Sequence, residues 1–216
     1  MAGRKTLPIA LFWAAASALT GLPVFAQPED SAVSAALALC ADLPEETQTA
    51  RDTLQANGWQ ASESATLVAL FNAIAAFNFD ASDLSYTFQN AGFMAGSVLG
   101  NSALGPDQIG MTFETYTTAA IGIAEGEAYC VLTGPNQLLS ALEQLDFNRE
   151  TQTSSGVVTR LTGALAGGHR VSAVEFDLAA LDLMLAESEL PADQVSRIQS
   201  YLSPVIVHIV SPEVPQ

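Results

Sequence analysis

Residues 111–133 read MTFETYTTAAIGIAEGEAYCVLT, and this stretch predicts two neighbouring antiparallel strands. The first part, Met111–Ala124, is rich in Thr, Tyr, Phe and Ile, which are residue types that favour strands. The second part, Glu127–Thr133, alternates between polar and apolar side chains. Glu125 and Gly126 between them suit a tight two-residue turn. We therefore expect a β-hairpin in the middle of the chain.

The segments on either side of this hairpin differ in their periodicity. Helical spacing of apolar residues and capping residues predict helices over 30–41, 42–57, 62–77, 135–145, 177–188 and 191–203. Apolar runs bounded by turn residues predict strands over 156–162, 169–176 and 205–210. The sequence thus predicts an α+β fold, with a helical N-terminal half packed on a mainly antiparallel sheet formed by the C-terminal half. One domain over residues 27–216 suits this length.

The helix predicted over 62–77 is the most clearly periodic one. It places its large apolar side chains on one face, namely Leu67, Leu70, Phe71, Ile74 and Phe77. Asn72 and Asn78 interrupt the apolar stretch, which is too short to span a membrane. The pattern indicates a core helix.

Three glycines recur every fourth residue further along, at Gly92, Gly96 and Gly100. This spacing lets helices approach closely, most familiarly in membranes. The segment favours a tightly packed helix or a loop loosened by glycine. A further alternative is a protein that associates with membranes through this segment.

The N-terminus has the layout of a secretory signal peptide. Arg4 and Lys5 precede an apolar stretch, Leu7–Leu19, and small residues lie at the positions that signal peptidase reads before Gln27. The apolar stretch holds 13 residues, fewer than the roughly 20 of a permanent membrane helix. The sequence therefore predicts a signal peptide over residues 1–26 and export to the periplasm or the extracellular space.

The charge of the chain is strongly negative. Its 216 residues include 23 acidic and 7 basic side chains, for a net charge of −16. Cleavage after residue 26 removes two basic residues and no acidic one, so that the mature charge is −18. Such a surface argues against nucleic-acid binding, which depends on neutralising phosphates with cations. It also argues against electrostatic docking on anionic membranes.

The chain has two cysteines, Cys40 and Cys130. In an exported protein an even number of cysteines predicts a disulfide, and here only one pairing exists. The alternative is two free thiols buried in the core as small apolar side chains.

Two histidines limit the chemistry that the chain can perform. His169 follows two glycines and precedes Arg170, so that the pair and the glycine amides form a candidate ligand-binding site for an anion. His169 is also the candidate general base, and the alternative is a plain surface histidine. His208 alternates with Ile206 and Val210 and is expected as a hydrogen-bonded histidine at the edge of the core.

Signatures of catalysis and metal binding are missing from the sequence. It contains no His-Glu-x-x-His, paired Cys-x-x-Cys, EF-hand or Gly-x-Ser-x-Gly pattern. We therefore expect no metal and no cofactor. The favoured function is an exported, non-catalytic binding or accessory module whose partner is a small molecule or an envelope protein. The alternative from a different class is a small exported hydrolase that uses His169.

Overall fold

The computed structural model describes residues 28–44, 46–101, 108–114, 117–124 and 127–212. The helices in these residues are α1 (Pro28–Ala41), α2 (Thr47–Ala56), α3 (Glu63–Phe77), α4 (Leu84–Asn101), α5 (Gln137–Glu143), α6 (Leu178–Glu187) and α7 (Ala192–Tyr201). The strands are β1 (Gln60–Ala61), β2 (Gln108–Phe113), β3 (Thr117–Ala124), β4 (Glu127–Gly134), β5 (Asn148–Ser154), β6 (Val158–Ala164), β7 (Arg170–Phe176) and β8 (Val205–Val210). The predicted α+β class is confirmed, because the helices lie mainly in the first half and the strands mainly in the second.

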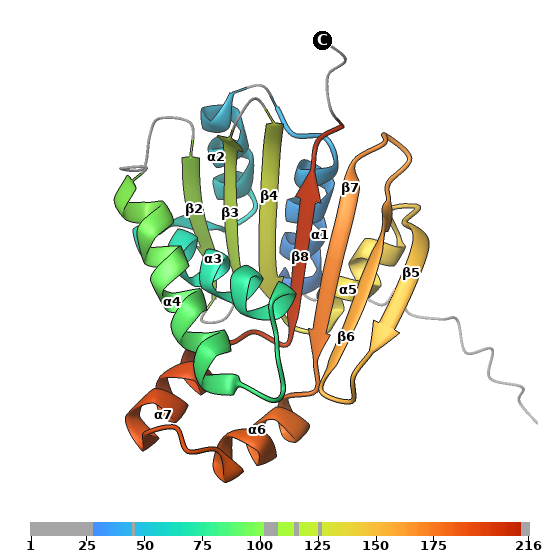
Figure 1. Cartoon of the computed structure of the whole chain (residues 1–216). Coiled ribbons are helices and arrows are strands. Elements are labelled where there is room, and N and C mark those ends of the chain that lie inside the picture. The colour runs from blue at the N-terminus through green and yellow to red at the C-terminus, as the bar shows by residue number, and fades with distance from the viewer. Residues whose placement is uncertain (1–27, 45, 102–107, 115–116, 125–126, 213–216) are drawn as a thin grey trace, which may run out of the picture.

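The strands form one antiparallel sheet in the order β1-β2-β3-β4-β8-β7-β6-β5. Two sets of consecutive strands, β1–β4 and β5–β8, therefore start at opposite edges and run inward. They meet where β8 pairs with β4, with His208 opposite Val131. The last described strand thus lies in the centre of the sheet, as Figure 1 shows.

Helices cover both faces of the sheet (Figure 1). On one face α1, α2 and α5 enclose a core that includes Leu37, Leu54 and Ile209. On the other face α3 contacts β2, β3, β4 and β8, and α4 packs against α3. Helices α6 and α7 lie beyond one end of the sheet, at the bottom of Figure 1. Alternate residues of β8 point to the two faces, so that Ile206 belongs to the second core and Val207 to the first.

The predicted central hairpin is formed by β3 and β4, which pair from Thr118–Thr133 to Ala124–Glu127. The turn predicted at residues 125–126 lies outside the described residues. Where one strand was expected over 111–124, the structure has the end of β2 and then β3. The chain turns between them at Glu114, whose φ is 55°. The sequence has no Gly or Pro here that would predict a turn.

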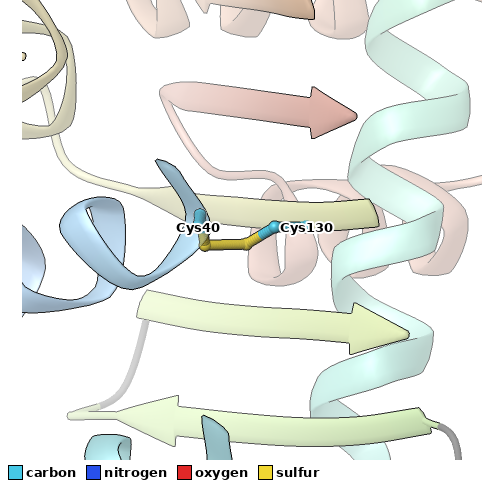
Figure 2. Close-up of a disulfide and its surroundings, with 2 residues drawn as sticks. All are labelled: Cys40 and Cys130. Atoms are coloured by element: carbon cyan, nitrogen blue, oxygen red, sulfur yellow. A yellow bond between two sulfur atoms is a disulfide. The ribbon is translucent and has the colours of Figure 1, made fainter. Parts of the chain in front are cut away.

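The predicted disulfide is confirmed. Cys40 at the C-terminal end of α1 is bonded to Cys130 in β4, with Cα atoms 5.7 Å apart (Figure 2). Both residues are fully buried. The bond fixes the first helix to the middle of the sheet within the first core.

Among the described residues, no helix is long and apolar enough to cross a membrane. The predicted signal peptide over residues 1–26 lies outside the described part of the chain.

Candidate ligand-binding groove

Helix α3 turns its small residues, rather than its large ones, toward the sheet. Its buried side chains are mostly alanines, including Ala65, Ala69 and Ala76. The helix lies so close to β2 that a Cβ at Gly110 would collide with the side chain of Thr66. The sequence-based assignment of the large apolar face to the core is therefore wrong for Leu67, which is 39% exposed. Close packing against the sheet thus relies mainly on small side chains of α3.

The outward face of α3 forms one wall of an open groove between α3, α4 and α7, which we call the α3–α4–α7 groove. Its volume is about 410 Å³. Each helix contributes four residues: Ser64, Leu67, Val68 and Phe71 from α3, Phe88, Gln89, Gly92 and Phe93 from α4, and Gln194, Arg197, Ile198 and Tyr201 from α7. The residues from α3 and α7 follow i, i+3, i+4, i+7 spacing, which is that of one helix face.

Several of the aromatic rings that line the groove contact one another. Phe71 stacks on Phe88 with ring centroids 6.3 Å apart and meets Tyr201 edge-on at 6.3 Å. Phe88 and Ile198 are buried beneath the groove, whereas Phe93 is 72% exposed at its rim. The rings thus line the space between the helices without filling it.

Two glycines leave open space beside helix α4, and one of them, Gly92, lines the groove. A Cβ at Gly92 would meet no described atom within 4 Å, and the same holds for Gly96 one turn later. Both glycines lie in a regular helix, so that the expectation of a loosened loop is not met. The tight packing expected at these positions is also absent for Gly92 and Gly96, and the surroundings of Gly100 are outside the described residues.

A buried amide holds α7 in place against α3. Asn72 donates from Nδ2 to the carbonyl oxygens of Val68 and Tyr201, each at 2.8 Å. Its Oδ1 accepts from the backbone N–H of Ser203 at 2.7 Å. Asn72 is fully buried and thereby positions the end of α7, which supplies Tyr201 to the groove. The sequence signalled it only as a polar interruption in an apolar helix.

The polar residues of the groove are all able to donate hydrogen bonds. They are Ser64, Gln89, Gln194, Arg197 and the hydroxyl-bearing Tyr201. Arg197 forms an exposed ion pair with Asp193 one turn earlier, at 3.5 Å. Of the described residues that line the groove, none is acidic. This is notable in a chain with 23 acidic side chains.

The residues predicted as a site from the sequence lie elsewhere. His169 precedes β7, and its Nδ1 is buried without a hydrogen-bond partner among the described residues. Arg170 follows at the start of β7, opposite Val210. The carbonyl of His169 accepts from the backbone N–H of Leu165 at 3.0 Å, across the loop between β6 and β7. That these two residues bind an anion stays a prediction.

The second histidine lies at the edge of the core, as predicted. His208 is partly buried, and its ring centroid is 6.1 Å from that of Phe77. Burial lowers its pKa, and the nearby positive charge of Arg170 lowers it further. In the described part of the chain, no group of three or more His, Cys, Asp or Glu residues could hold a metal ion.

Comparison with known proteins adds no assignment, because no family model, curated protein or solved structure matches the chain.

Proposed function

We propose that the protein is an exported, non-catalytic binding module that holds a small apolar molecule in the α3–α4–α7 groove. One observation carries the proposal: α3 buries alanines and presents Leu67 and Phe71 to an open space. A volume of about 410 Å³ falls in the range of small-molecule sites. Such sites combine apolar walls with a few polar groups, which is the composition of this groove.

The energetics support a ligand in this position. Fully covering one large apolar side chain is worth about 1.5–3 kcal/mol. Leu67 and Tyr201 are 39% and 47% exposed, and both line the same space. A ligand that covers them together with Phe93 therefore gains free energy from several side chains at once.

Export is supported by the disulfide. Disulfides persist in oxidising compartments and are rare in the cytosol. The Cys40–Cys130 bond is buried and connects two layers of the fold. Together with the signal-peptide pattern it favours a periplasmic or extracellular location. A mature mass beginning at Gln27 tests this location, and a mass that retains Met1 would contradict it.

The binding proposal is tested by filling the groove from α4. Replacing Gly92 by Leu places a side chain in space that no described atom occupies within 4 Å of the new Cβ. Gly96→Leu is the matched control, because Gly96 is equally open but does not line the groove. Both changes replace a helical glycine by a better helix former and should stabilise the fold by about 0.8 kcal/mol.

The assay is fluorescence titration with the neutral dye Nile red. We expect the wild type and Gly96→Leu to bind the dye with the same affinity. In Gly92→Leu the affinity should fall at least tenfold, which corresponds to about 1.4 kcal/mol. Equal binding by all three proteins, or no binding by the wild type, would reject the groove as the binding site.

A second candidate is association with membrane surfaces through α4. The helix Leu84–Asn101 contains no charged residue, although the chain as a whole is strongly acidic. Phe93 and Met94 are 72% and 44% exposed on it. Flotation with zwitterionic vesicles tests this candidate, and mature protein that stays at the bottom of the gradient would remove it.

A further inference from the structure

We propose that the molecule bound in the α3–α4–α7 groove is an anionic amphiphile of the fatty-carboxylate class, whose head group is held by Arg197. This inference rests on the proposed binding function and specifies its ligand. It depends on the charges around the groove and on the chemistry of its polar residues.

The groove reverses the charge balance of the rest of the molecule. The chain has more than three acidic residues for each basic one. Yet Arg197 is the one charged residue among the described residues that line the groove. A cationic ligand would be attracted to the molecule as a whole, but it would find no carboxylate in the lining to accept its hydrogen bonds. An anion finds a guanidinium there.

The polar atoms suit a carboxylate in number and kind. Arg197 and Gln194 both lie on α7, three residues apart, so that they share one side of the groove. A carboxylate accepts hydrogen bonds only, and guanidinium and amide N–H groups donate them. A guanidinium also binds a carboxylate with two parallel hydrogen bonds, which fixes its orientation.

The existing partner of Arg197 does not prevent this contact. The Arg197–Asp193 distance is 3.5 Å, and the two side chains are 66% and 73% exposed. An exposed pair of this kind contributes little to stability. The guanidinium can therefore turn toward a ligand whose apolar body lies on Phe71 and Tyr201, since all three residues line the same space.

The test compares three ligands of equal chain length, namely decanoate, decanol and decylammonium, as competitors of Nile red below their micelle concentrations. We expect the wild type to bind decanoate about tenfold more tightly than decanol, and decylammonium more weakly than either. In Arg197→Gln the preference for decanoate over decanol should fall to about twofold or less. The ratio of the decanoate affinity to the decanol affinity is measured within one variant. General damage to the groove would lower both affinities and leave this ratio unchanged, so that it can be told apart from loss of the head-group contact.

The matched control is Arg149→Gln. It removes one positive charge as well, but Arg149 lies on β5, is paired with Glu143 at 2.7 Å and does not line the groove. The wild-type preference should persist in it. Equal affinity of the wild type for decanoate and decanol, or a preference for decylammonium, would overturn the inference while leaving the binding function intact. Failure of all three ligands to compete with a bound dye would also overturn it, and failure of the dye itself to bind would overturn the proposed function too.

Discussion

Replacing Cys40 and Cys130 together by alanine removes the covalent link between α1 and β4, and the cost can be worked out from the chain. The two cysteines are 90 positions apart. For a loop of this length, the chain-entropy relation gives about 4–5 kcal/mol of stabilisation, because the cross-link restricts the unfolded chain. This is a large part of the 5–15 kcal/mol that typically separates folded from unfolded proteins.

Urea unfolding measures this loss directly. Trp59 is the one tryptophan after residue 26 and a buried reporter, whose Nε1 donates to the carbonyl of Ala32 in α1 at 3.2 Å. With a slope of about 2 kcal/mol per molar urea, the midpoint should fall by about 2 M. The control is wild-type protein that has been reduced while unfolded and then refolded with its two thiols free. It lacks the cross-link but keeps both sulfur atoms, so it separates the effect of the cross-link from that of the lost side-chain volume. A midpoint shift below about 0.5 M in this reduced form would refute the reasoning.

Three further changes test other parts of the structure. Asn72→Leu removes the buried amide that donates to the carbonyl of Tyr201 and accepts from the N–H of Ser203. Because buried polar groups lose these hydrogen bonds, we expect a loss of about 2–4 kcal/mol in urea unfolding together with weaker Nile red binding. Because burial and Arg170 lower the pKa of His208, the unfolded chain takes up its proton more readily. The free energy of unfolding should therefore fall as the pH drops below about 6.5. This fall should be smaller in His208→Gln, and urea unfolding at two pH values measures it in both proteins. Asp177→Ala removes the side-chain cap of α6 and should cost about 1 kcal/mol in thermal unfolding, with no change expected in the groove.

Several elements could be predicted because their sequence signals are local. Strand β8 is an unbroken apolar run apart from His208, and Pro204 and Pro212 bound it. Helix α6 begins where the Oδ1 of Asp177 accepts from the N–H of Ala180 at 3.0 Å, which is a standard N-terminal cap. The disulfide was predicted from an even cysteine count in a chain whose N-terminal sequence has a signal-peptide pattern.

Other elements have no such signal. Every residue of β5 is exposed, and its sequence NRETQTS lacks the polar–apolar alternation of a half-buried strand. The strand forms because β6 offers it an edge to pair with, which is information from elsewhere in the chain.

The groove could not be predicted from periodicity either. Helical spacing identified the apolar face of α3 correctly, but it could not show that the alanine face packs against the sheet. That choice depends on Gly110, far along the chain in β2, which lets α3 approach. The opposite wall comes from α7, and Asn72 in α3 bonds there to Tyr201, 129 positions later. Contacts of this sequence separation leave no pattern in any one segment.

The central place of β8 has a consequence for the order of folding. Until residues 205–210 leave the ribosome, β4 and β7 each lack a neighbour, and two half-sheets with open edges are all that can form. Open edges invite pairing with other chains, and contacts between distant segments form slowly. The one continuous sheet is therefore completed only when β8 inserts between β4 and β7, so that formation of this last described strand joins the two halves of the fold.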